Sequence, residues 1–190
     1  MSLETEVKLK VDDHASLRDR LTAAGAHRLG SVLEHNHIYD RPDRSLFAAD
    51  EGLRVRVWLE RDGRPGTAGT LTFKGPRRPG RIKSRPELEV EVADARSAGA
   101  ILEAIGFVRV VSFQKRRETW ELSTCRVELD ELPPSNRYVE IEGPDEATIR
   151  ETEIRLGLDP AATEDRTYIA LVIEHLGARL PDDRDLLFEN

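Results

Sequence analysis

Polar and apolar residues alternate with a period of two in at least seven segments of the chain, which is the pattern of β-strands with two unlike faces. The alternation is clearest in residues 3–11, 53–57, 71–74, 87–92, 126–130 and 138–142. A less regular segment at 111–121 predicts a seventh strand, and residues 32–39 could form an eighth. We therefore expect a mostly antiparallel sheet of seven or eight strands.

Helical patterns lie between the strands, and each ends just before a glycine, a common helix stop. The predicted helices span residues 14–24, 97–105, 146–156 and 164–176. The segment 75–86 is rich in Pro, Gly, Arg and Lys and predicts a mobile basic loop. Its Arg81, Lys83 and Arg85 could close over a ligand, or the loop could simply be solvated.

The polar faces of the predicted strands are almost entirely charged, and the charges are grouped by sign. Arg54 and Arg56 share one face of a strand, whereas Glu87, Glu89 and Glu91 share a face of another. For a single strand, a solvated face is the ordinary explanation. Like charges two residues apart repel, however, unless opposite charges lie beside them, and this grouping recurs in strand after strand.

A sheet closed on itself resolves this, because charges of both signs then meet inside while apolar side chains face surrounding helices. We expect an α+β fold, a closed eight-stranded antiparallel β-barrel with helices packed outside. Residues 1–180 are expected to form a single domain, with 181–190 as a loosely attached C-terminal tail. The predicted interior cations are Lys8, Lys10, Arg54, Arg56, Lys74, Lys115, Arg117 and Arg126. The predicted interior anions are Glu4, Glu6, Glu87, Glu89, Glu91, Glu128, Asp130, Glu140 and Glu142.

Such an interior points to a charged ligand, because burying unpaired charges costs several kcal/mol each. Arginine and lysine side chains suit phosphate oxygens. Clustered carboxylates suit hard cations such as Mg²⁺ or Mn²⁺. The sequence therefore predicts a metal-bound polyphosphate inside the barrel.

Composition narrows the classes of partner. The formal net charge is −7, and no basic tail suggests duplex nucleic acid. No apolar run approaches the roughly 20 residues needed to span a bilayer. Cys125 is the single cysteine, which excludes an intrachain disulfide and suits a reducing compartment. We expect a cytoplasmic protein that binds neither nucleic acid nor a membrane.

The ordered charged pairs resemble a known family. The segment Glu4-Thr5-Glu6-Val7-Lys8 fits the E-x-E-x-K signature that opens the CYTH superfamily, also called triphosphate tunnel metalloenzymes. The pairs that follow are Arg54 and Arg56, Thr72 and Lys74, Glu87 and Glu89, Lys115 and Arg117, Glu128 and Asp130, and Glu140 and Glu142. Residues 38–40 and 127–143 look like the class IV adenylyl cyclase branch, the CyaB type. His37 departs from that branch, many members of which carry an acidic residue there.

The resemblance implies an eight-stranded tunnel with metal on the glutamates of its first and last strands and phosphates on its lysines and arginines. The implied metal ligands are Glu4, Glu6, Asp130, Glu140 and Glu142, with Glu128 as a helper. The implied phosphate-binding residues are Lys8, Lys10, Arg54, Arg56, Lys74, Lys115 and Arg117. Alternatively, the two sets only pair with each other across the barrel. Tyr39 or Lys8 could orient or deprotonate the nucleophile, although Tyr39 could equally be a packing residue at the rim.

Three hypotheses for function remain open. The first is a Mg²⁺- or Mn²⁺-dependent enzyme, either an adenylyl cyclase that converts ATP to cyclic AMP and pyrophosphate or a phosphohydrolase of tripolyphosphate or thiamine triphosphate. The second is a non-catalytic nucleotide- or polyphosphate-binding sensor, which has less need for so many carboxylates. The third is an ordinary solvated sheet protein without a site. The resemblance also leaves room for a homodimer.

Overall fold

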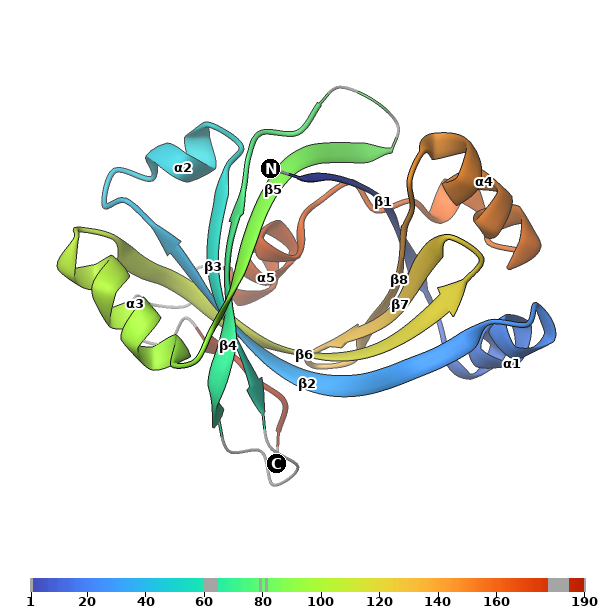
Figure 1. The fold of residues 1–190 in the computed structure, drawn as a ribbon, viewed down its shortest axis with the longest axis horizontal. Helices are drawn as coiled ribbons and strands as arrows, with labels where there is room; N and C mark the ends of the chain where they lie inside the picture. The colour runs from blue at the N-terminus through green and yellow to red at the C-terminus, as the bar shows by residue number, and fades with distance from the viewer. Residues whose placement is uncertain (1, 60–64, 79, 81, 178–184, 190) are drawn as a thin grey trace.

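Eight strands form a ring in the computed structural model, which describes residues 2–59, 65–78, 80, 82–177 and 185–189 (Figure 1). The strands are β1 (Ser2–Val11), β2 (His27–Asp40), β3 (Gly52–Leu59), β4 (Pro65–Lys74), β5 (Lys83–Val92), β6 (Val108–Leu122), β7 (Cys125–Leu132) and β8 (Asn136–Glu142). Their order is β2-β3-β4-β5-β1-β8-β7-β6, and β6 pairs back with β2. Every neighbouring pair in the ring is antiparallel. The predicted α+β class and eight-stranded antiparallel ring are confirmed.

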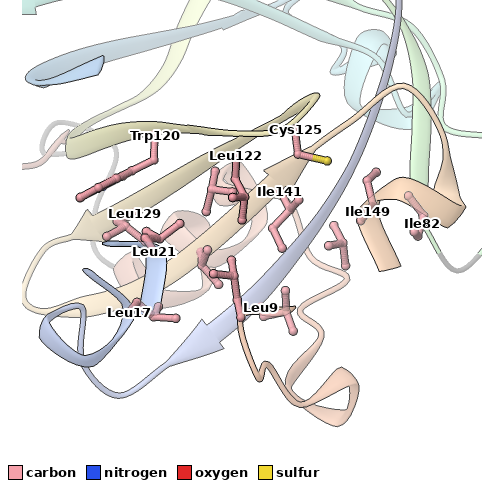
Figure 2. Close-up of a cluster of buried hydrophobic side chains, with 14 residues drawn as sticks. Leu9, Leu17, Leu21, Ile82, Trp120, Leu122, Cys125, Leu129, Ile141 and Ile149 are labelled. Carbon is pink, nitrogen blue, oxygen red and sulfur yellow. The ribbon is translucent and has the colours of Figure 1, made fainter. Parts of the chain in front are cut away.

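Three helices cover the outside of the ring, namely α1 (Ala15–Ala23), α3 (Ala95–Ala104) and α4 (Glu146–Arg155). The largest apolar cluster joins Leu17 and Leu21 of α1 and Ile149 of α4 to outward side chains such as Leu9 and Leu129 (Figure 2). A second outer cluster packs α3 on β3. Burial of these apolar faces stabilises the ring from outside and leaves the alternate, charged faces pointing inward.

The fourth long helix, α5 (Tyr168–Leu176), packs differently from the predicted outer helices. Its Val172 and Leu176 join a cluster with Ile38, Phe113 and Tyr138. These three residues alternate in phase with the charged inner residues of β2, β6 and β8, so α5 packs against the inner face at one end of the ring, inside its outline in Figure 1. An apolar stripe predicts a buried helix face but does not reveal which side of the sheet it meets.

Two segments that the sequence predicted to be loose are partly ordered against the ring. Within the predicted basic loop, β5 begins at Lys83, and Arg85 is buried with its guanidinium bonded to backbone carbonyl oxygens. Arg81 lies outside the described residues. In the predicted tail, Asp185–Leu186 form β9, which pairs parallel to β6. The Phe188 amide donates to Gln114 at 3.0 Å, so this part of the tail is docked.

Two short elements went unpredicted, the helix α2 (Ser45–Ala48) and the 3-10 helix η1 (Pro160–Ala162). The Asp40 carboxylate accepts hydrogen bonds from the amides of Arg41, Leu46 and Phe47 and thereby holds α2 at the end of β2. Within the described part of the chain, no helix is long and apolar enough to cross a membrane.

Candidate active site in the ring interior

The ring encloses a cavity of about 610 Å³ whose lining is dominated by charged side chains. The predicted site residues that line it are Glu4, Glu6, Lys8, Arg54, Arg56, Lys74, Lys115, Arg117, Glu128, Glu140 and Glu142. They come from six different strands, and the register of the ring brings them together. Glu6 is paired across β1 with Lys83 on one side and Glu142 on the other.

One part of the site is fully ion-paired and centres on Asp130, which is completely buried. Its carboxylate accepts from Lys115 Nζ at 3.1 Å, from Arg117 Nε at 2.7 Å and from the Tyr168 hydroxyl at 2.8 Å. Burial alone would raise the pKa of Asp130, but the charges of Arg117 and Lys115 hold it well below its usual value. Asp130 therefore holds the side chains of Lys115 and Arg117 in place from a buried position behind the cavity wall.

Glu34 extends this pairing along β2. Its carboxylate lies 3.2 Å from Arg56 Nη1 and 3.5 Å from Lys115 Nζ, and Arg56 Nε donates to Asn36 at 3.0 Å. Although burial opposes it, the charges of Lys115 and Arg56 lower the pKa of Glu34 to about 2. We call Glu34, Arg56, Lys115, Arg117 and Asp130 the compensated group.

Two lysines that line the cavity are placed differently. Lys8 Nζ donates to the backbone carbonyl oxygen of Arg166 at 2.5 Å, and Lys83 Nζ donates to that of Glu164 at 2.9 Å. Neither ammonium forms an ion pair with a carboxylate of the described residues. Burial lowers the pKa of Lys8 to about 8 and also lowers the pKa of Lys83. A nearby anion would reverse both shifts.

Arg54 is a third cation of this kind. Its Nε is buried without a hydrogen-bond partner among the described residues. Its Nη2 donates to Thr72 at 3.1 Å and lies 3.4 Å from the Glu89 carboxylate. Burial and the neighbouring charge of Arg56 lower the pKa of Arg54 to about 10. An orphaned guanidinium donor beside a second arginine is typical of an anion-binding site.

Carboxylates on β1 and β8 are shifted in the opposite sense. Burial, with help from the charge of Glu6, raises the pKa of Glu4 to about 8 and that of Glu140 to about 7. Burial and the charge of Glu128 raise the pKa of Glu142. We call Glu4, Lys8, Arg54, Lys83, Glu140 and Glu142 the uncompensated group, because each pKa is shifted towards the neutral form. For the two glutamates that have an ion pair, this shift persists although Lys74 lies 2.6 Å from Glu4 and Arg117 lies 2.6 Å from Glu140.

The acidic members of this group, together with Glu6, have the chemistry of a site for a hard divalent cation. The carboxylates of Glu6 and Glu142 accept no hydrogen bond from a described residue, and both line the cavity. Oxygen atoms of Glu128, Asp130 and Glu140 lie within 4.8 Å of one another, but Arg117 occupies this triplet and lies 2.6 Å from Glu140. Carboxylate oxygens that repel one another around a cavity fit Mg²⁺ or Mn²⁺.

Three predicted site residues lie elsewhere than the sequence indicated. Lys10 is exposed and does not line the cavity. Tyr39 points outward into the cluster under α3, where its hydroxyl would lie 2.5 Å from a Cβ added at Gly99, and burial raises its pKa. Asp130 is buried behind its three partners and is not part of the lining. Tyr39 therefore packs outside the ring and does not face the cavity, because side chains alternate along β2 and its neighbour Ile38 points inward.

Several lining or supporting residues escaped the sequence analysis. Glu34 and Asn36 repeat the inward charged pattern of the other strands, and that spacing could have identified them. Lys83 was assigned to the basic loop rather than to a strand. Tyr168 had no local signal, because its helix was expected outside the ring. Its ring lies 4.1 Å from Lys8 Nζ and 5.0 Å from Lys115 Nζ, close enough for cation–π contacts.

Comparisons with known proteins agree with this geometry. A sequence model of the CYTH domain matches residues 2–168. The adenylate cyclase CyaB of Aeromonas hydrophila is 27% identical over 183 residues, which cover 91% of this chain and 90% of that protein. The solved PH1819 protein of Pyrococcus horikoshii superposes with a TM-score of 0.74 at 26% identity, covering 90% of this chain and 99% of that one. A putative adenylyl cyclase from Hippeastrum, described as having a dominant triphosphatase activity, gives a TM-score of 0.66 at 18% identity and covers 95% and 99%.

Proposed function

The chain belongs to the CYTH domain family, and on that premise we propose that it is a divalent-metal-dependent enzyme acting on a triphosphate in the ring cavity. One observation carries the proposal. Among the described residues, the cavity holds cations without a carboxylate partner and carboxylates without a donor. Lys8 and Lys83 donate only to backbone carbonyl oxygens of these residues, Arg54 Nε has no partner among them, and Glu6 and Glu142 accept no hydrogen bond from them. A metal–triphosphate complex supplies both missing charges in one ligand.

Each group has a separate role in this proposal. Glu6, Glu140 and Glu142, with Glu4, hold the metal ion, which would polarise phosphate oxygens and neutralise developing charge. Lys8, Lys83 and Arg54 bind the phosphate oxygens. The compensated group holds Arg117 and Lys115 rigid at the cavity wall, so that their charges are pre-organised before substrate arrives.

The first candidate reaction is that of an adenylyl cyclase, which the CyaB relative favours. A new bond forms between the ribose 3′-oxygen and the α-phosphorus, the bond from that phosphorus to the bridging oxygen breaks, and pyrophosphate leaves. The hydroxyl proton must pass to an acceptor. Lys8 has a pKa of about 8 in the free site, but a bound triphosphate would raise that value, so phosphate binding is the better supported of its two predicted roles.

The second candidate is hydrolysis of the terminal phosphate, in which water attacks the γ-phosphorus and the β–γ bridge breaks. The activity ascribed to the similar Hippeastrum structure favours it. Both reactions use the same metal and phosphate contacts, and they differ in which phosphorus meets the nucleophile.

Product analysis separates the candidates. Purified protein is incubated with ATP, tripolyphosphate or thiamine triphosphate, each with Mg²⁺ and with Mn²⁺, and the products are resolved by chromatography. Cyclic AMP with pyrophosphate supports the cyclase, and orthophosphate with the diphosphate supports the hydrolase. Binding of all three ligands without consumption of any would overturn the enzyme proposal in favour of a sensor.

A further inference from the structure

At the end of the ring where α2 and α5 lie, the cavity lining includes apolar side chains. The apolar side chains of the lining are Ile38, Phe47, Ala48, Leu53, Phe113, Ile169 and Ala170. Ile38 and Leu53 lie next to the β2–β3 connection that contains α2, whereas Ile169 and Ala170 belong to α5. The charged residues of β1 and of β3 to β8 line the rest of the cavity. The apolar side chains of the lining therefore gather at one end, which we call the apolar part although Asp50, Glu51, Arg77, Asp165 and Arg166 also line it.

Arg77 links the two elements that form this apolar part. Its Nε lies 2.8 Å from the Asp50 carboxylate, just after α2, and its Nη1 donates to the backbone oxygen of Asp165, just before α5, at 3.3 Å. Arg85 also donates to the Asp50 backbone oxygen at 2.7 Å. The two elements are thus tied to each other and to the wall of the ring at one mouth.

Phe47 is the distinctive side chain at this mouth. It is 61% exposed and belongs to none of the three apolar clusters, yet it lines the cavity. Its backbone is held in place, because the Phe47 amide donates to Asp40 at 3.1 Å and the neighbouring Leu46 packs against the cluster under α3. Isolated exposed apolar residues are common. Ile101, equally exposed on α3, is one of them and does not line the cavity.

We propose that Phe47, with Ala48 and Ile169, forms a subsite for a planar aromatic ring, so that the natural substrate is an organic triphosphate rather than inorganic tripolyphosphate. The inference rests on the proposed triphosphate site. Small-ligand sites combine apolar and aromatic walls with a few polar groups, and a cavity with one charged and one apolar part matches a ligand with a phosphate chain and a ring. An anchored aromatic side chain offers a stacking face at little cost in conformational entropy.

Equilibrium binding tests this subsite, with Ca²⁺ in place of Mg²⁺ throughout as a hard divalent cation, and chromatography after each titration confirms that the ligand is intact. Isothermal titration calorimetry is carried out with β,γ-methylene-ATP, thiamine triphosphate and tripolyphosphate on the wild type and on Phe47→Ala. We expect the variant to bind the preferred ring-bearing ligand about tenfold more weakly, equivalent to about 1.4 kcal/mol, and tripolyphosphate with unchanged affinity. The ring-bearing ligand that loses affinity identifies the kind of ring.

Two further variants serve as controls. Phe47→Trp keeps a stacking face and should retain wild-type affinity for the ring-bearing ligand, and Ile101→Ala should leave all affinities unchanged. Equal weakening of tripolyphosphate and the ring-bearing ligands in Phe47→Ala would overturn the subsite, as would no change for any ligand. If the wild type binds none of the three, the proposed triphosphate site itself fails, and the subsite fails with it.

Discussion

The compensated and uncompensated groups line or support one cavity, but they differ in how their charges are balanced. Asp130 is surrounded by Lys115, Arg117 and Tyr168, and its pKa is lowered. On β1 and β8, Lys8 and Glu140 lie in register, and each has a pKa shifted towards its neutral form. Complete pairing stabilises a rigid framework, whereas incomplete pairing leaves charges available for a ligand. The difference separates residues that hold the site from residues that would bind in it.

The largest expected effect comes from breaking a complete pairing. Asp130→Asn leaves Lys115 and Arg117 buried without their shared counter-charge, which should lower the free energy of unfolding by about 3–5 kcal/mol. Glu142→Gln removes a carboxylate that repels Glu128 and should leave stability unchanged or slightly raised. Urea denaturation measures both. Similar losses in the two variants would remove the distinction between the groups.

A second comparison uses two neighbouring arginines. Arg54→Met removes an orphaned donor and should lower kcat/KM for the triphosphate about 100-fold, with stability changed by less than about 1 kcal/mol. Arg56→Met leaves Glu34 without one of its cations and should destabilise the fold more than Arg54→Met does. Lys10→Ala, at an exposed position outside the cavity, serves as the control and should change neither quantity. An Arg54 variant with full activity would exclude Arg54 from substrate binding.

A smaller effect should appear in the pH dependence of stability without metal. The pKa of Glu140 is raised from 4.5 to about 7 in the folded protein, so the folded state binds more protons than the unfolded state between these values. The contribution of protonated Glu140 to the free energy of unfolding is present below pH 4.5 and is lost as the pH rises through 7. In EDTA, the free energy of unfolding should therefore fall more steeply over this range in the wild type than in Glu140→Gln. Parallel curves for the two proteins would contradict the shift.

The ring was predictable because its signal repeats. Alternation such as that of Arg54 and Arg56 identifies the two faces of a strand from the sequence alone. Because acidic and basic faces recur on different strands, a closed sheet that brings them together is the arrangement that balances their charges. The side of the sheet that α5 covers was not predictable, because an apolar stripe on a helix fits either face. Docking of Asp185–Leu186 depends on an edge of β6 that only the assembled ring provides.

The sequence predicted which side chains of the site face inward, but it did not predict which of them pair with each other. The inward direction of Glu6 or Lys115 follows from strand phase, and the same phase would have turned Tyr39 outward. Which cation neutralises which carboxylate depends on register and side-chain reach. The difference between Asp130, which is buried behind its partners, and Glu142, which faces the cavity, could therefore not be read from the sequence.

Binding of Mn²⁺ measured by electron paramagnetic resonance tests the central claim most directly, because it probes the two cavity carboxylates that accept no hydrogen bond from a described residue and does not require turnover. The wild type is compared with the double variant Glu6→Gln/Glu142→Gln, and urea denaturation checks that both are folded. We predict stoichiometric Mn²⁺ binding by the wild type and at least about tenfold weaker binding by the double variant. Equal Mn²⁺ affinity in the two folded proteins would contradict the account.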